Sequence, residues 1–231
     1  MSFLTAEWRD LVMLNYEVSP EILAAHLPAG TELDRWQGRT FVSVVGFRFL
    51  RTKVLGIAVP FHRDFEELNL RFYVRRKAEE GWRRGVVFVR EVVPRRAVAW
   101  LARLFYNENY VAHPMEHEIS PGRVAYRWRS AGRWYTLSLD PTGKSAVPPQ
   151  GSEEAFITEH YWGYARQRDG GTVEYRVEHP RWPVRRAVTS MLECDVAGFY
   201  GPAFAPALGR APSSAFLAEG SAVTVHRGVR L

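Results

Sequence analysis

The sequence has little cysteine, little lysine and no long hydrophobic run. A single cysteine in 231 residues, Cys194, excludes an internal disulfide and favours a reducing compartment, so we expect a cytoplasmic protein. Charged residues interrupt every apolar stretch well before the roughly 18 residues that a membrane-spanning helix needs. The first residues, MSFLTAEWRD, lack the basic-then-apolar order of a secretory signal. We therefore expect no membrane association.

The positive charge rests almost entirely on arginine. Only three lysines are present, Lys53, Lys77 and Lys144, while the formal net charge is +6. A basic chain can bind nucleic acid, but acidic residues interrupt the arginines, and no helix-turn-helix, zinc-ligand or RNP-type pattern accompanies them. Nucleic-acid binding is therefore a minor alternative. Eight tryptophans and thirteen phenylalanines leave a second alternative, an apolar patch for a protein partner or a homo-oligomer.

The chain is long enough for a single domain over residues 1–231, and it alternates strand patterns with a few helical ones. We predict strands at 39–50, 65–77, 82–93 and 221–229, hairpins at 123–140 and 161–179, and short helices at 19–30, 94–107 and from Ser152. Many antiparallel strands with few helices predict an α+β fold built on one large, curved sheet that can close into a barrel.

The stretch HPMEH, residues 113–117, has the H-x-x-E-H spacing of one class of zinc peptidase. Such a site needs both histidines on one face of a helix, but Pro114 and Pro121 confine the segment and no third ligand is evident. We favour a strand instead. Its one face would carry Val111, His113, Met115, His117 and Ile119, and the other Glu116 and Glu118. This strand is expected to line a cavity, and zinc is the less favoured alternative.

The stretch VPRRAV places two arginines at the start of a predicted helix. Pro94 is placed like a first helical residue, so Arg95 and Arg96 fall in the first turn. Cations there oppose the helix dipole at about 0.3–1 kcal/mol each, and stability alone would favour Asp or Glu. Two interpretations stay open. The arginines bind a carboxylate or phosphate, or they are solvated or paired with acids such as Glu91.

Residues 65–77 alternate strictly between apolar and polar. Leu68, Leu70, Phe72 and Val74 face one way, and Glu67, Asn69, Arg71 and Tyr73 face the other. On a half-buried sheet the polar face would meet solvent, whereas in a closed barrel it lines a ligand cavity. The Asn and Tyr between Glu and Arg favour the cavity.

No nucleophile or cofactor motif stands out. Cys194 has no histidine near it in sequence and is expected to be a buried structural thiol. No nucleophile elbow, phosphate loop or dinucleotide fingerprint occurs. We therefore expect no cofactor and no metal.

The order of several segments resembles a known family. LNLRFYV is followed by VPRRAVAWLARLFYNENYVAHPM, a tyrosine-rich hairpin, FITEHYWGY and VEHPRWPVRRA. This set resembles the YqjF-like uncharacterised family, a domain of unknown function in the acetoacetate decarboxylase-like superfamily. The resemblance runs from EWRDLVMLNYEV to SAVTVHRG and rests on the order rather than on one motif. It implies an α+β fold whose sheet closes into a cone-like β-barrel around an internal cavity.

The resemblance also implies what the cavity does not do. In the decarboxylases a Pro-Lys-Lys stretch stands in the place of Pro94-Arg95-Arg96, and one lysine forms a Schiff base with the β-keto acid. Arginine stays protonated and cannot form the imine. The three lysines of this chain are expected in exposed turns. Schiff-base decarboxylation is therefore not expected, although Glu67 resembles a glutamate of the decarboxylase site.

We expect the cavity to bind a small organic anion, a carboxylate or keto acid. Arg71, Arg95 and Arg96 would hold the anion, and Glu67 would act as general base if burial raises its pKa. The expected wall residues are Asn69, Tyr73, Tyr106, Tyr110, His113, Met115 and His160, with Tyr161, His179 and Trp182 as further candidates. Whether the site belongs to a lyase or hydratase without a Schiff base, or to a binding protein without catalysis, stays open.

Overall fold

The alternating patterns form long strands that pair into one sheet. The computed structural model describes residues 2–58, 62–95 and 109–231. Its strands are β1 Ser2–Glu17, β2 Glu32–Leu33, β3 Phe41–Val54, β4 Ile57–Ala58, β5 Phe65–Ala78, β6 Gly81–Val93, β7 Tyr110–Ala112, β8 Met115–Ser120, β9 Arg123–Ser130, β10 Arg133–Pro141, β11 Trp162–Arg166, β12 Thr172–Glu178, β13 Val184–Glu193, β14 Ser214–His226 and β15 Val229–Arg230. The helices are α1 Pro20–Ala24, α3 Glu153–Thr158, α4 Val196–Tyr200 and α5 Ala205–Leu208, with a 3₁₀ turn at Pro202–Phe204. The predicted α+β class and most predicted strands are confirmed.

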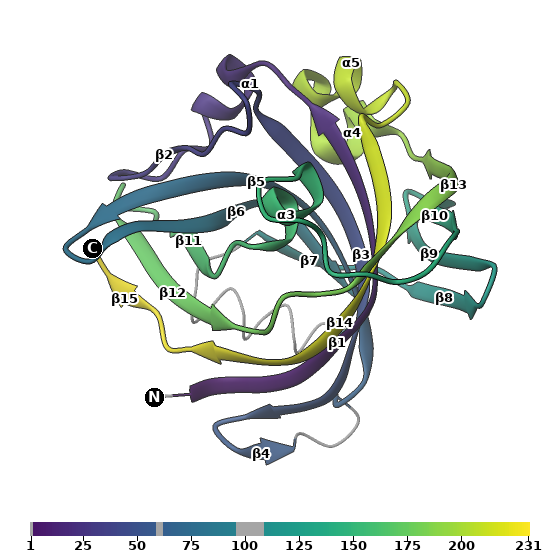
Figure 1. Cartoon of the computed structure of the whole chain (residues 1–231), viewed down its shortest axis with the longest axis horizontal. Helices are drawn as coiled ribbons and strands as arrows, with labels where there is room; N and C mark the ends of the chain where they lie inside the picture. The colour runs from purple at the N-terminus through teal and green to yellow at the C-terminus, as the bar shows by residue number, and fades with distance from the viewer. Residues whose placement is uncertain (1, 59–61, 96–108) are drawn as a thin grey trace.

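The strands close into a ring. The sheet runs β15-β12-β11-β6-β5-β3-β1-β14-β13-β10-β9-β8, and an additional pairing joins β12 to β14. Val177 of β12 lies opposite Val225 of β14 in that pairing. Figure 1 shows β5 and β6 arching over one side and β12, β14 and β1 over the other, with α3 between them. The cone-like shape of the barrel stays a prediction.

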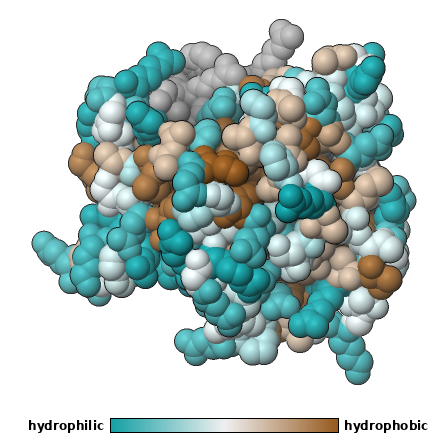
Figure 2. Space-filling view, turned by 90° about the horizontal axis from the view of Figure 1, so that it is seen from above, coloured by the Kyte–Doolittle hydropathy of each residue, from teal (hydrophilic) through white to brown (hydrophobic). Residues whose placement is uncertain are grey.

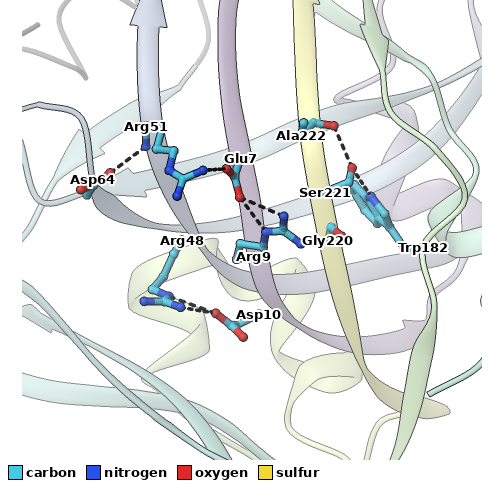
Figure 3. Close-up of polar contacts among 10 residues, drawn as sticks. All are labelled: Glu7, Arg9, Asp10, Arg48, Arg51, Asp64, Trp182, Gly220, Ser221 and Ala222. Atoms are coloured by element: carbon cyan, nitrogen blue, oxygen red, sulfur yellow. Dashed lines mark hydrogen bonds and ion pairs between the residues drawn. The ribbon is translucent and has the colours of Figure 1, made fainter. Parts of the chain in front are cut away.

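A bulge bends β1 where the sheet curves most visibly. The register of β1 against β3 shifts between Arg9 and Val12, and Asp10 has φ 57°. Arg48 of β3 donates from Nε and Nη2 to Asp10 Oδ2 (Figure 3), and the Tyr126 hydroxyl donates to the Asp10 carbonyl at 2.9 Å. Bulges increase local twist, and these contacts hold the left-handed residue in place.

Two apolar clusters lie on opposite faces of the ring. Leu68, Leu70 and Phe72 of β5 pack outward against β9, β10 and the helices α4 and α5. Phe65 and Tyr73 of the same strand belong to a second cluster on the inner face. The strict alternation of β5 thus divides its side chains between an outer core and the interior of the ring.

The local signals for the hairpin turns and for the starts of two helices are confirmed, but α1 ends at Ala24 rather than near Gly30, and the Ser19 side chain makes no capping hydrogen bond. Pro20 begins α1 after Ser19, and Ser152 caps α3 by accepting from the Ala155 amide. The hairpins β9–β10 and β11–β12 form as predicted. The helix predicted over 94–107 lies outside the described residues except for Pro94 and Arg95.

The single strand predicted through HPMEH is wrong. β7 ends at Ala112 and pairs with β6, whereas β8 begins at Met115 and pairs with β9. The His113 amide still donates to the Val93 carbonyl, but the next contact is from the Arg129 amide to the Pro114 carbonyl. Pro114 has no N–H to continue the first ladder, so the chain changes partner there. The segment does not form the helix that the zinc motif requires.

The face of the molecule seen in Figure 2 is mostly polar. Hydrophilic residues cover most of the face in Figure 2, and hydrophobic residues gather near its middle. None of the helices in the described part of the chain has the length and hydrophobicity that spanning a membrane requires.

Candidate functional site

A cavity of about 190 Å³ lies on the inner face of the ring. Its walls come from β1, β3, β5, β6, β7, β11, β12 and β14, from α3, from the segments after α3 and β12, and from His62. Most of the lining is apolar or aromatic, including Leu11, Phe47, Phe49, Phe65, Val86, Phe88, Ile157 and Trp162. A few polar side chains interrupt this lining, which is the usual make-up of a small-molecule site.

Three predicted residues of β5 line this cavity together. Glu67, Asn69 and Arg71 are 3%, 2% and 9% exposed. Asn69 donates from Nδ2 to Glu67 Oε1 at 3.1 Å, and the Tyr110 hydroxyl donates to Glu67 Oε2 at 3.1 Å. Tyr110 also lines the cavity. The polar face of β5 therefore points inward, and two neutral donors orient the Glu67 carboxyl group.

Arg71 is buried without an acidic partner in the described part of the chain. Its Nη2 lies 3.5 Å from the Ile157 carbonyl, and its guanidinium carbon lies 5.8 Å from the centre of the Tyr73 ring. Its Nε has no hydrogen-bond partner in the residues described. Buried arginines are normally paired with an acid, so this cation is exceptional within the fold.

Tyr73 supports the cavity rather than lining it. Its hydroxyl lies 2.6 Å from Ser43 Oγ, and Ser43 in turn donates to Asn15 Oδ1. The Tyr73 ring packs 4.7 Å from the His160 ring and 5.4 Å from the Phe156 ring. The tyrosine thus holds the end of α3 against β5.

His160 lines the cavity and is held from behind by Asp34 and Arg84. Its Nε2 lies 3.1 Å from Asp34 Oδ2, and Arg84 donates to the same oxygen at 2.6 Å. Burial lowers the pKa of His160 to about 4. Burial would raise the pKa of Asp34, but the hydrogen bonds from His160 and Arg84 outweigh it and lower that pKa. At neutral pH the site therefore contains a neutral imidazole and an ionised Asp34.

His179 and Trp182 form part of the wall. Their rings stack with centres 4.0 Å apart, and the Trp182 indole donates to Ser221 Oγ of β14 at 2.9 Å (Figure 3). Ser221 donates onward to the Ala222 carbonyl. Burial lowers the pKa of His179 to about 4, so this imidazole is also neutral near pH 7.

These features coincide with a clear family match. The model of a family described as "uncharacterized conserved protein", DUF2071, matches residues 5–222. The chain belongs to this family. The uncharacterized protein YqjF of Bacillus subtilis is 27% identical over 199 residues, which cover 84% of this chain and 80% of that protein.

The fold is shared with acetoacetate decarboxylases. The crystal structure of acetoacetate decarboxylase from Legionella pneumophila matches with a TM-score of 0.71 at 12% identity, covering 99% of this chain and 87% of the other. The enduracididine biosynthesis enzyme MppR complexed with pyruvate matches with a TM-score of 0.69 at 14% identity, covering 100% and 91%. At these identities the likeness shows the fold alone. It agrees with the superfamily that the resemblance implied for this DUF2071 member.

Other predicted residues of this DUF2071 chain do not join the cavity. Arg95, His113 and Met115 line a second pocket with Arg48, Glu66 and His117. His113 packs on Phe199 at 5.8 Å, and Met115 packs against the outer cluster. None of the three lines the cavity that contains Glu67. Arg96 and Tyr106 lie outside the described residues.

Two cavity features were missed by the sequence analysis. Glu91 lines the cavity at 1% exposure and lies opposite Asn69 in the β5–β6 register. The sequence signal for Glu91 was a single acidic residue inside the apolar run of β6. Asp34 gave no such signal, because its partner His160 is 126 residues away. In the described part of the chain, no group of three or more His, Cys, Asp or Glu side chains is placed to hold a metal ion.

Proposed function

We propose that this DUF2071 protein binds a small organic anion, a carboxylate or keto acid, in the cavity of the ring. The observation that carries the proposal is the buried Arg71, which has no acidic partner among the residues that the structure describes. A buried guanidinium without an acid is costly, and an anion entering the cavity would supply the missing charge. Arginine also presents two parallel donors that match a carboxylate.

The rest of the cavity favours a ligand with an apolar part. Aromatic side chains such as Phe47, Phe65 and Trp182 surround the polar strip of β5. Burial of hydrocarbon against them contributes about 25 cal/mol per Å². A small acid with a carbon chain or ring therefore fits better than an inorganic anion.

The lysines argue against imine chemistry at this site. All three, Lys53, Lys77 and Lys144, are exposed, and none lines the cavity. The resemblance to the decarboxylases places their lysine pair where Arg95 and Arg96 stand in this chain, and arginine does not form a Schiff base. We therefore propose no Schiff-base decarboxylase activity for this chain.

A second candidate is a lyase or hydratase that uses Glu67 as a general base. Its support is the Glu67 carboxyl group, which accepts from Asn69 and Tyr110 and lines the same cavity as Arg71. A carboxylate that shares a cavity with an anion-binding arginine can act as general base on an acid whose carbon chain reaches from one to the other. MppR, a structural neighbour, was solved with pyruvate, which supports including keto acids among the candidate substrates.

A thermal-shift screen tests the proposed binding. Small carboxylates, keto acids, phosphates and the neutral amides of the same acids would be compared at equal concentration. A ligand that binds only the folded state raises Tm by mass action. We expect shifts from acids but not from amides. The shifts should vanish in Arg71→Met and persist in Arg75→Met, a matched control on the same strand whose side chain pairs with Glu32 outside the cavity. Equal shifts in both variants would overturn the proposal.

A further inference from the structure

Three buried polar atoms around the inner strip of β5 have no hydrogen-bond partner in the described residues. They are Arg71 Nε, Asn69 Oδ1 and His160 Nδ1. All three residues line the cavity, and each is more than nine-tenths buried. Buried polar atoms nearly always have a hydrogen-bond partner. These three atoms therefore indicate which donors and acceptors a bound ligand would need.

The free atom of Asn69 is an acceptor. Its amide nitrogen faces Glu67 Oε1 at 3.1 Å. In this contact the amide NH₂ group donates to the carboxyl oxygen. The carbonyl oxygen of Asn69 is left for the cavity.

The free nitrogen of His160 is also an acceptor. Its Nε2 lies 3.1 Å from Asp34 Oδ2, and Arg84 Nη2 lies farther away, at 3.4 Å. Asp34 is ionised and can only accept, so Nε2 carries the proton and Nδ1 carries a lone pair. A carboxylate behind a histidine fixes the imidazole tautomer in this way.

These atoms lie around Arg71. Asn69 and Arg71 are two residues apart on one face of β5, about 7 Å along the strand. The Ile157 carbonyl contacts Arg71 Nη2, and His160 follows three residues later with its ring against Tyr73. A cation is thus flanked by two acceptors, one from the strand and one from the segment after α3.

Two other unpartnered atoms lie elsewhere along the cavity. Trp8 Nε1 and Thr52 Oγ1 come from β1 and β3. Trp8 pairs with Phe49, which pairs with Phe65 of β5, six residues from Arg71. At roughly 3.3 Å per residue they are too distant to serve the group beside a carboxylate bound at Arg71.

We propose that the cavity selects hydroxy acids over the matching keto acids. This inference rests on the proposed anion binding and names its ligand class. The ligand's carboxylate forms an ion pair with Arg71, and the ligand's hydroxyl group donates to Asn69 Oδ1 or His160 Nδ1. A ketone in that place presents only lone pairs to two acceptors and leaves both unsatisfied. Sites built to hydrogen-bond a hydroxyl discriminate strongly against analogues that lack it.

Matched pairs of acids test the inference by calorimetric titration of the wild-type chain. The probes are 2-hydroxybutanoate with 2-oxobutanoate, 3-hydroxybutanoate with acetoacetate, and 3-phenyllactate with phenylpyruvate. In at least one pair we expect the hydroxy acid to bind about tenfold or more tightly. Asn69→Leu, or His160→Gln if that variant does not fold, should reduce the ratio while binding through Arg71 remains.

The outcomes separate this inference from the proposed function. Keto acids that bind as tightly as their partners, with binding lost in Arg71→Met, would overturn the hydroxyl preference and leave anion binding standing. Absence of binding by every acid in the series would overturn both. A preference that is unchanged in both variants would overturn the assignment to Asn69 and His160.

Discussion

His160, a residue of the cavity lining, donates from Nε2 to Asp34 Oδ2 across 3.1 Å. The contact joins the segment after α3 to the residue that follows β2. It fixes the tautomer of a buried imidazole. Together with the hydrogen bond from Arg84, it lowers the pKa of Asp34 and keeps that carboxylate charged. The pair therefore supplies a neutral histidine to the cavity at physiological pH.

This pair predicts that the folded state loses stability in mild acid. Burial lowers the pKa of His160 from 6.5 to about 4, so the unfolded chain binds the proton more readily. Stability is fully present above about pH 6.5 and falls as the pH drops toward 4, by roughly 1.4 kcal/mol per pH unit for each such histidine. Urea unfolding at several pH values measures this slope. His160→Gln should remove one histidine's share and leave those of His26, His113 and His179, whose pKa values burial also lowers. Parallel slopes in wild type and variant would contradict the assignment.

Glu67→Gln is expected to separate binding from catalysis. The substitution removes a negative charge from the cavity that also contains Arg71, but it keeps a similar shape and one acceptor. Affinity for a carboxylate should stay the same or rise by up to about tenfold, because a repulsion is lost. Any turnover that depends on proton abstraction should fall about 100-fold or more. Titration and activity on the same preparation give both numbers, and unchanged turnover would exclude Glu67 as the base.

Gly220 is predicted to be required for its backbone conformation and for the space beside Trp8. It has φ +75°, and a Cβ there would lie 2.0 Å from the Trp8 carbonyl. Gly220→Ala should destabilise the fold by about 2 kcal/mol or more. Gly30→Ala is the matched control, since Gly30 has φ +78° with nothing within 4 Å of its Cβ. The loss of unfolding free energy in Gly30→Ala measures only the cost of placing an alanine at a positive φ. Equal losses of unfolding free energy in the two variants would show that the Trp8 contact is unimportant.

The sequence predicted what depends on local pattern. The period-2 alternation of residues 65–77 correctly put Leu68 and Leu70 on one face and Glu67, Asn69 and Arg71 on the other, because strand geometry alone separates those faces. Which face points inward depends on the closure of the sheet. The capping serine at 152 and the glycine turn at 170–171 acted in the same local way.

Predictions that depend on distant partners were less successful. The two strands around Pro114 pair with β6 and β9, so the sequence periodicity through HPMEH did not describe a single face. The tautomer of His160 depends on Asp34, and the inward position of Glu91 on its register against Asn69. Such pairings arise from the closure of the sheet, which local sequence does not encode.

The central claim is that Arg71 recognises a negative charge inside the ring. The most direct measurement is calorimetric titration of the wild-type protein with butanoate and with butanamide, which share a carbon skeleton and differ in charge. We predict binding of butanoate alone, lost in Arg71→Met and retained in Arg75→Met. Equal affinity for the acid and the amide, or retention of acid binding in Arg71→Met, would contradict it.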